Sequence, residues 1–250
     1  MAGSRKVIAV TGKGGTGKTA LVSVLVKVLA GMGSVLAIDG DSAGGLQYTL
    51  GTTVSETIGD IRKNIIDNPS RRKEIENEHI RTVISGALTD GPNFKLMVMG
   101  RAEGPGCYCQ VNELLKYGIE SLSSKFDYVL IDCEAGPEQI SRRILQKADV
   151  LLIMIDGSVR SIQVAKVISS LAKELLAKEF DKAGLVINRY KPEEDVVTRT
   201  VEQFGLDVLG YVPEDRDISD YDRTGRPLIE LADTSPSVAS VRELVQKLVS

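Results

Sequence analysis

The sequence has 250 residues, of which 42% are hydrophobic and only 4% are aromatic. This length is sufficient for one large α/β domain, and the aliphatic composition suits a buried parallel sheet. The formal net charge of −3 argues against an extensive nucleic-acid-binding surface. The three cysteines form no disulfide framework, and the sequence contains neither a secretory signal nor a run of about 18 apolar residues. We therefore expect a cytoplasmic protein that binds neither nucleic acid nor membrane.

Apolar segments typical of strands alternate with amphipathic segments along the chain. The expected strands are Lys6–Thr11, Ser34–Asp39, Phe94–Met99, Tyr128–Asp132, Val150–Asp156, Gly184–Asn188 and Asp207–Tyr211. The expected helices are Lys18–Leu29, Val111–Leu122, Glu138–Gln146, Val159–Lys178, Pro192–Phe204 and Ser237–Leu248. This alternation predicts βαβ units. We expect residues 1–250 to form a single α/β domain with a mostly parallel central sheet and helices on both faces.

A long insertion from Val54 to Gly91 is rich in charge, and it includes the run Arg71-Arg72-Lys73-Glu74-Ile75-Glu76. Because runs of charge are usually solvated, we interpret the insertion as an exposed helical face.

The first expected strand is followed by a glycine-rich loop that matches the pattern G-x-x-x-x-G-K-[ST] and leads into a helix. In such a loop, backbone N–H groups and the helix N-terminus supply the positive potential that binds phosphates. Lys18 is expected to reach the β- and γ-phosphates of a nucleotide, and the Thr19 hydroxyl to bind Mg²⁺. The residues expected to hold the nucleotide here are Gly12, Gly14, Gly15, Thr16, Gly17, Lys18, Thr19 and Ala20.

Acidic residues follow two of the other expected strands. Asp39 and Asp41 leave the second strand, and Asp132 ends the strand that begins at Tyr128. Because the carboxyl ends of parallel strands face the ligand crevice, these carboxylates belong beside the phosphates. Asp132 is expected to hold Mg²⁺ through a coordinated water.

The loop has an additional lysine, Lys13, and Lys13-Gly14-Gly15-Thr16-Gly17-Lys18-Thr19 resembles the signature of the deviant Walker A ATPases. This P-loop family includes MinD, ParA, the nitrogenase iron protein and related metallochaperones. The resemblance implies an ATPase that converts ATP to ADP and phosphate, with Lys13 crossing a homodimer interface to the partner's nucleotide. The alternative for Lys13 is a solvated side chain beside the loop.

The same resemblance assigns further site residues. It implies that Asp41 orients or deprotonates the attacking water, although Ser42 stands where the family often has proline. It also implies that the Gly136 N–H approaches the γ-phosphate. Asn188 and the adjacent Arg189 are placed at the adenine base, with Pro213 on its opposite side. For Asn188, a turn-forming role is the alternative.

Cys107 and Cys109 form a C-x-C pair between a Gly-Pro-Gly turn and an expected helix. A helix N-terminus lowers the pKa of a thiol and favours the thiolate, which is the form that binds metals. Two chains related by a two-fold axis would supply four thiolates, a set that suits Ni²⁺, Zn²⁺ or an iron–sulfur cluster. A pair of small apolar residues and a redox pair are the alternatives. Cys133, beside Asp132, is interpreted as a core residue with a lesser redox or metal role left open.

The order of these motifs, from Met99-Gly100-Arg101 through Cys107-Tyr108-Cys109 to Asp132, Glu134, Ala135 and Gly136, resembles the CooC-type ATPases. These insert nickel into carbon monoxide dehydrogenase. The resemblance implies an ATP-dependent nickel metallochaperone that works as a nucleotide- and metal-linked homodimer with a nickel enzyme as client. A positioning ATPase of the MinD or ParA kind and an iron–sulfur reductase related to the nitrogenase iron protein are the alternatives.

Overall fold

The core of the structure is a sheet whose strand order is β3-β4-β2-β5-β1-β6-β7-β8. The computed structural model describes residues 5–68, 70, 80–101, 116–117, 119–136, 148–175, 180–191, 205 and 207–249. The strands are β1 (Lys6–Gly12), β2 (Val35–Asp39), β3 (Thr89–Gly91), β4 (Phe94–Val98), β5 (Tyr128–Asp132), β6 (Ala148–Ile155), β7 (Phe180–Tyr190) and β8 (Asp207–Pro213).

All neighbouring strands run parallel except β3, which pairs antiparallel with β4 at one edge of the sheet. Parallel pairing brings the carboxyl ends of the strands to a common edge. In the register, Asp132 of β5 lies between Val10 of β1 and Asp39 of β2. The end of β1, from which the glycine-rich loop departs, therefore lies next to two buried carboxylates.

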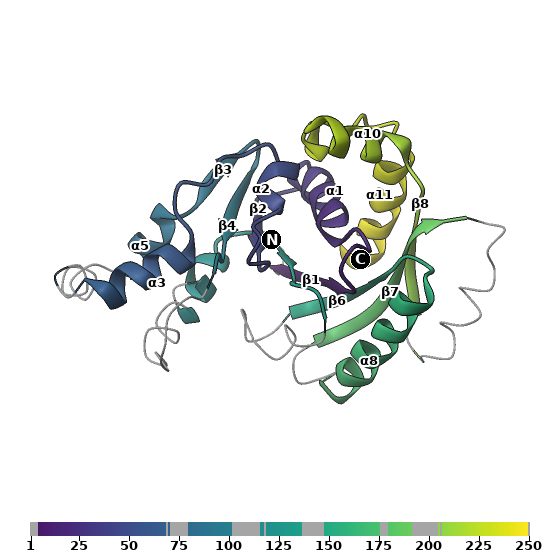
Figure 1. Cartoon of the computed structure of the whole chain (residues 1–250), viewed down its shortest axis with the longest axis horizontal. Helices are drawn as coiled ribbons and strands as arrows, with labels where there is room; N and C mark the ends of the chain where they lie inside the picture. Colours follow the sequence, from purple (N-terminus) through teal and green to yellow (C-terminus); the bar gives the residue numbers. More distant parts are fainter. Residues whose placement is uncertain are drawn as a thin grey trace.

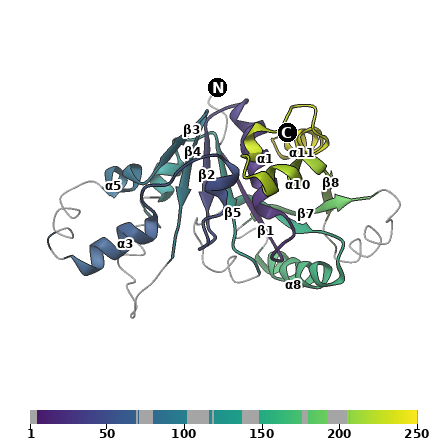
Figure 2. The same cartoon turned by 45° about the horizontal axis from the view of Figure 1, so that its top comes forward.

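Helices cover both faces of this sheet, as Figures 1 and 2 show. The helices are α1 (Lys18–Ala30), α2 (Leu46–Thr49), α3 (Ile58–Asp67), α5 (Ile80–Gly86), α8 (Val159–Leu175), α10 (Arg216–Thr224) and α11 (Pro236–Val249), with a 3₁₀ turn η1 (Leu228–Glu230). Alternate side chains of the strands enter two apolar clusters. One contains buried residues of α1, α2 and α11, and the other contains those of α3, α5 and α8. The predicted α/β class, with a mostly parallel sheet covered on both faces, is confirmed.

All seven predicted strands are present, and several differ from the prediction at their ends. β7 extends from Phe180 to Tyr190, well beyond the predicted Gly184–Asn188. The prediction omitted the short strand β3, the one-turn helix α2, the turn η1 and the helix α10. The predicted helices Glu138–Gln146 and Pro192–Phe204, and residues 111–115 and 118 of the predicted helix Val111–Leu122, lie outside the described residues, whereas residues 116, 117 and 119–122 are helical as predicted. Within the described part of the chain, no helix is both long and apolar enough to cross a membrane.

The interpretation of the 54–91 insertion as an exposed face was incomplete. α3 exposes Lys63 and Asn64, but it buries Ile58, Ile61 and Ile65 in the core. Two buried isoleucines of α5, Ile80 and Ile84, join the same cluster. The spacing of these isoleucines places them on one side of each helix, so the insertion contributes to the core. The charged run at 71–76 lies outside the described residues.

Candidate nucleotide site

The glycine-rich loop between β1 and α1 is held together by hydrogen bonds to the carbonyl of Lys13. This carbonyl accepts hydrogen bonds from the Thr16 hydroxyl at 2.8 Å, from the Thr16 N–H at 3.4 Å and from the Lys18 ammonium at 3.4 Å. Thr16 is fully buried, and Lys18 is 8% exposed. The half-buried Lys13 side chain donates to the Gly14 carbonyl of its own loop at 3.0 Å. Lys13 thus has to leave this contact before it can reach a partner's nucleotide.

The end of β7 holds the outer side of the loop. The Asn188 amide donates to the Thr16 carbonyl at 2.8 Å, and the Arg189 guanidinium donates to the Gly15 carbonyl at 3.4 Å. Gly17 has φ +92°, and a Cβ there would lie 2.5 Å from the Asn188 amide nitrogen. Only glycine satisfies both the left-handed backbone and this close approach. Arg189 also has a positive φ of 53°, beside an irregularity in the β7–β8 register.

Asp132 and Thr19 meet below the loop. The Thr19 hydroxyl donates to Asp132 Oδ2 at 2.7 Å. Asp132 is 1% exposed, and its other oxygen, Oδ1, has no hydrogen-bond partner among the described residues. Burial, with a smaller contribution from the neighbouring Asp39, raises the pKa of Asp132 to about 7. Such a buried carboxylate is stabilised in its charged form by a cation.

This donor set fits the expected Mg²⁺. The unpartnered Asp132 oxygen and the adjacent Thr19 hydroxyl are oxygen ligands, which Mg²⁺ prefers together with waters and nucleotide phosphates. In the described residues, no group of three or more His, Cys, Asp or Glu side chains is placed to hold a metal. Asp132 and Thr19 would therefore hold Mg²⁺ only together with a nucleotide, as in other phosphate loops.

Asp39 organises the segment that carries Asp41. Its two carboxylate oxygens accept from the Asp41 N–H at 3.0 Å and the Leu46 N–H at 2.8 Å. Asp39 is fully buried, and burial raises its pKa to about 6. The Asp41 carboxylate itself accepts from the Ala43 N–H at 2.9 Å and lines the same cavity as the loop. Asp39 thus has a structural position, whereas Asp41 is available to act on a ligand.

The segment after β5 rests against the phosphate loop. The Gly136 N–H donates to the Gly12 carbonyl at 3.2 Å, so it has to leave this bond to approach a γ-phosphate. Next to Asp132, the thiol of Cys133 is buried, and burial raises its pKa to about 12. The protonated thiol is a poor metal ligand, which favours the core role for Cys133.

A cavity of about 620 Å³ opens beside these elements. Its lining includes the loop residues Gly14, Gly15, Gly17, Lys18, Thr19 and Ala20, together with Asp41, Asn188, Arg189, Pro213, Glu214 and Asp215. The cavity therefore extends from the phosphate loop to the end of β8, on the path from the phosphates to the expected base position. Several residues that were predicted from the sequence line this cavity: Lys18, Asp41, Asn188, Arg189 and Pro213.

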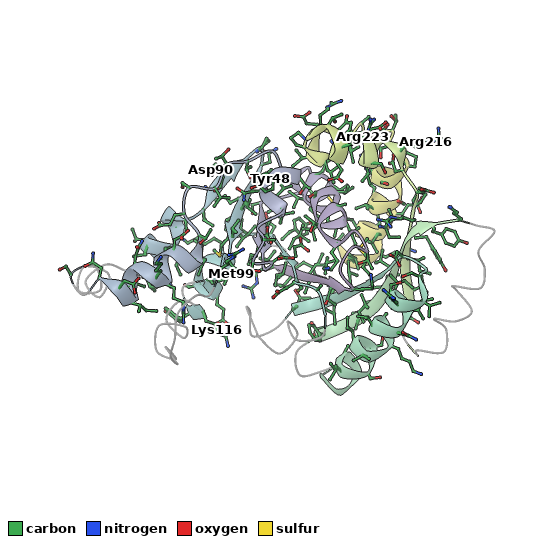
Figure 3. All side chains as sticks on the ribbon, in the orientation of Figure 1. Tyr48, Asp90, Met99, Lys116, Arg216 and Arg223 are labelled. Carbon is green, nitrogen blue, oxygen red and sulfur yellow. The ribbon has the colours of Figure 1, made fainter. Side chains whose placement is uncertain are left out.

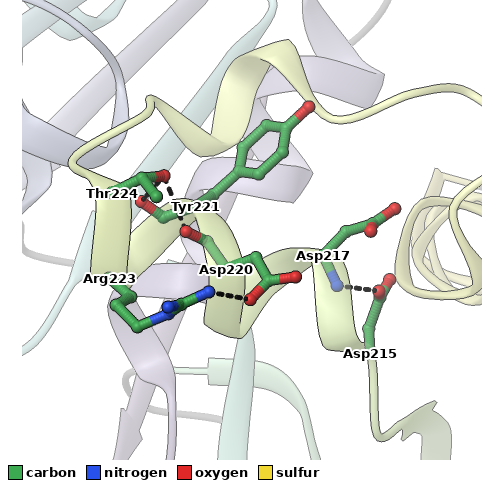
Figure 4. A network of polar contacts seen from close by, with 6 residues as sticks. All are labelled: Asp215, Asp217, Asp220, Tyr221, Arg223 and Thr224. Atoms are coloured by element: carbon green, nitrogen blue, oxygen red, sulfur yellow. Dashed lines mark hydrogen bonds and ion pairs between the residues drawn. The ribbon is translucent and has the colours of Figure 1, made fainter.

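Asp215 is among the residues of this wall that were not predicted. Asp215, 8% exposed, is the N-cap of α10, and its carboxylate accepts from the Asp217 N–H at 3.0 Å (Figure 4). It also accepts from the Ser235 hydroxyl at 2.6 Å and from the Ser237 N–H at 3.1 Å, at the start of α11. Asp215 thus joins the first turns of two helices and fixes the Pro213–Glu214 segment. An aspartate between a strand and a helix is a recognisable capping signal.

The predicted roles of these residues stay predictions, because the structure contains no ligand. The structure gathers Lys13, Lys18, Thr19, Asp41, Asp132, Gly136, Asn188, Arg189 and Pro213 around one edge of the sheet. The cysteine pair, Cys107 and Cys109, lies outside the described residues.

Comparison with known proteins agrees with this site. The model of the CobQ/CobB/MinD/ParA nucleotide-binding domain matches residues 7–228. An ATP-binding protein of Methanocaldococcus jannaschii is 38% identical over 98% of both chains. The carbon monoxide dehydrogenase accessory protein CooC of Rhodospirillum rubrum is 30% identical over 90% of both chains.

Solved structures give the same fold. MinD from the MinC:MinD complex of Aquifex aeolicus covers 97% of this chain and 95% of its own, with a TM-score of 0.74 and 23% identity. MinD of Pyrococcus horikoshii in complex with Mg-ADP has a TM-score of 0.71, with 21% identity over 98% of this chain and 96% of its own. The chain belongs to the CobQ/CobB/MinD/ParA family of nucleotide-binding domains, and it is an ATP-binding P-loop ATPase of the MinD/ParA type.

Proposed function

We propose that this ATPase is a nickel metallochaperone, in which two chains hold one Ni²⁺ through Cys107 and Cys109 and use ATP to deliver it to a nickel enzyme. The observation that carries the proposal is a C-x-C pair in a chain that aligns with CooC over 90% of its length. The name of that relative makes carbon monoxide dehydrogenase, or a related nickel enzyme, the proposed client. Because thiolate ligands survive in a reducing compartment, we place the activity in the cytoplasm.

The nucleotide chemistry follows from the residues around the loop. Lys18 neutralises phosphate charge, and Thr19 with Asp132 holds Mg²⁺, which would supply further positive charge to the phosphates. Asp41 lines the same cavity as the phosphate loop, where its carboxylate can orient a water. Lys13, once released from the Gly14 carbonyl, would add its charge across the dimer at the moment of transfer.

A positioning ATPase of the MinD kind is the second candidate, since MinD of Synechocystis is 24% identical over 90% of this chain. MinD-like membrane binding would need an exposed amphipathic helix. In the structure, the apolar side chains of α11 (Val238, Val241, Leu244, Val245 and Leu248) are buried with those of α1. That helix is therefore not available to a membrane without partial unfolding. Co-sedimentation with anionic liposomes tests this candidate.

Anaerobic titration with nickel tests the leading proposal. Wild type and the Cys107→Ala/Cys109→Ala variant are titrated with Ni²⁺ in the presence of ADP or ATP, and the mass of the complex is followed. The expected result is one thiolate-dependent Ni²⁺ per two chains, lost in the variant together with nickel-linked dimerisation. Nickel binding of equal strength in both proteins would contradict the proposal. A broad visible absorbance after anaerobic purification would instead indicate an iron–sulfur cluster.

A further inference from the structure

The carboxyl end of β4 is joined to two other elements at one point. We define the β4 junction as Asp39, Thr57, Gly59, Met99 and Gly100. The Met99 N–H donates to the Asp39 carbonyl at 2.9 Å, and the Met99 carbonyl accepts from the Gly59 N–H at 2.8 Å. Met99, labelled in Figure 3, therefore bridges the end of β2 and the start of α3 through its backbone hydrogen bonds.

The contact with α3 provides a hydrogen-bond acceptor for an amide at the N-terminus of that helix. The first amides of a helix have no acceptor within the helix. Met99 supplies one for Gly59, and the Thr57 hydroxyl accepts from the Asp60 N–H at 3.1 Å in a capping box. The first turn of α3 is thus held directly to the end of β4.

The junction has room only for glycine at two positions. A Cβ at Gly59 would lie 2.5 Å from the Arg101 carbonyl oxygen. A Cβ at Gly100, where φ is +65°, would collide with the Thr57 hydroxyl. Since such contacts are shorter than van der Waals separation, a methyl group at Gly59 has to displace the backbone at Arg101, and one at Gly100 has to displace the Thr57 side chain.

Asp39 connects the junction with the nucleotide site. Its side chain binds the Asp41 and Leu46 amides, while its carbonyl binds Met99. One fully buried residue therefore holds the Asp41 segment by its carboxylate and the end of β4 by its backbone. A shift of the Asp41 segment would be passed to Met99, and from Met99 to α3, through hydrogen bonds of 2.8–3.0 Å.

We propose that the β4 junction transmits the nucleotide state from the Asp41 segment to α3 and to Arg101, the last described residue before the cysteine pair. Gly59 is a positioning residue in this scheme, because it sets the distance between α3 and Arg101. The purpose of the coupling rests on the proposed nickel function, whereas the coupling to α3 stands on the junction itself. Coupling of this kind links two sites through an element that both bias.

The test uses a matched pair of variants in the full chain. Gly59→Ala places a methyl group against the Arg101 carbonyl, whereas Gly86→Ala, at the end of α5, places one in open space. Thr57→Ala removes the cap of α3 without adding an atom, and it serves if Gly59→Ala fails to fold. Hydrogen–deuterium exchange of the peptide 57–67 is compared with Mg-ADP and with a non-hydrolysable Mg-ATP analogue, and the nickel affinity is measured under the same conditions.

Wild type and Gly86→Ala are expected to show slower exchange of this peptide with one nucleotide than with the other, and a nickel affinity that differs by about 5-fold or more between them. In Gly59→Ala, both differences are expected to disappear, with KM for ATP changed less than about 2-fold. The inference would be overturned if the exchange rate of the peptide 57–67 in wild type were the same with both nucleotides. It would also be overturned if Gly59→Ala showed the same nucleotide-dependent differences as wild type. An intact exchange response without thiolate-dependent nickel binding would refute the proposed function and leave the coupling to α3 standing.

Discussion

The carboxylate of Asp132 is buried beside Asp39, and one of its oxygens has no hydrogen-bond partner among the described residues. Its pKa is raised to about 7, so the folded state holds a proton that the unfolded chain releases at lower pH. Between pH 4 and 7 the native state therefore binds more protons than the unfolded state, and this residue lowers stability as the pH rises. A site built for a cation is in this way a source of instability when the cation is missing.

We predict that Asp132→Asn stabilises the protein when nucleotide and Mg²⁺ are absent, and that it abolishes Mg²⁺-dependent hydrolysis. At pH 8, where the wild-type carboxylate is charged, the gain in unfolding free energy should be about 1–3 kcal/mol. At pH 5 the carboxyl is protonated in the native state but largely ionised in the unfolded chain, so the gain should be smaller than at pH 8. Thermal unfolding in EDTA measures both values, and a gain that does not grow with pH would contradict the assignment.

Gly17 provides a second prediction at the scale of the residue. Gly17→Ala should weaken ATP binding by about 10- to 100-fold, since the methyl group strains the left-handed backbone and collides with Asn188. In an Asn188→Ala background the same substitution should cost less, because the collision is gone. Gly225→Ala, which has φ +70° and open space around its Cβ, is the control for backbone strain alone. Equal losses in both backgrounds would show that Asn188 does not restrict Gly17.

At the scale of the element, α10 depends on its cap. α10 has no fully buried side chain, and its contact with the core is made by the partly buried Ile218 and Tyr221, so its stability depends strongly on its cap. Asp215→Ala removes the acceptor for the Asp217 and Ser237 amides and for the Ser235 hydroxyl, and it should lower the unfolding free energy by about 2–4 kcal/mol. Asp220→Asn, which breaks only the exposed ion pair with Arg223, should cost less than about 1 kcal/mol. Urea denaturation of both variants makes the comparison.

The amount of apolar sequence in an element explains which elements could be predicted from the sequence. β5 and α1 carry continuous apolar runs or rows, and their burial is visible as a pattern. α10 has just two apolar residues, Ile218 and Tyr221, and the three-residue β3 is defined by its pairing with β4. Both segments are too short in apolar residues to give a periodic signal. The prediction for the insertion rested on its high charge, although the isoleucines at positions 58, 61 and 65 mark a buried face.

In the nucleotide site, too, only features that are local in the sequence could be predicted. The phosphate loop could be recognised because its residues are contiguous and its glycines have local backbone reasons. The hold of Asn188 on Thr16 joins residues 172 positions apart, and the bond from the Ser235 hydroxyl to Asp215 spans 20. Such contacts depend on strand order and helix placement, so no local pattern predicts them. The bridge from Asp39 through Met99 to Gly59 is hidden for the same reason.

At the scale of the whole molecule, the proposed homodimer makes a prediction about shared active sites. Lys13→Gln and Asp41→Asn should each be inactive alone, because each homodimer lacks one of the two groups in both sites. If Lys13 acts across the interface, a mixed dimer contains one complete site. An equal mixture should then recover about a quarter of the wild-type ATPase activity, because half of randomly formed dimers are mixed and each has one working site. No recovery above the sum of the single variants would place Lys13 in its own chain's site.

The measurement that tests the central claim most directly is the rate at which nickel leaves the loaded protein. Wild type and Asp41→Asn are loaded anaerobically with Ni²⁺ and ADP, transferred to Mg-ATP or a non-hydrolysable analogue, and followed with a chelator that reports free nickel. Hydrolysis should speed release from wild type at least several-fold with Mg-ATP, but not with the analogue and not from Asp41→Asn. Release at one rate in all four conditions would contradict the account, because ATP hydrolysis would then have no effect on nickel release.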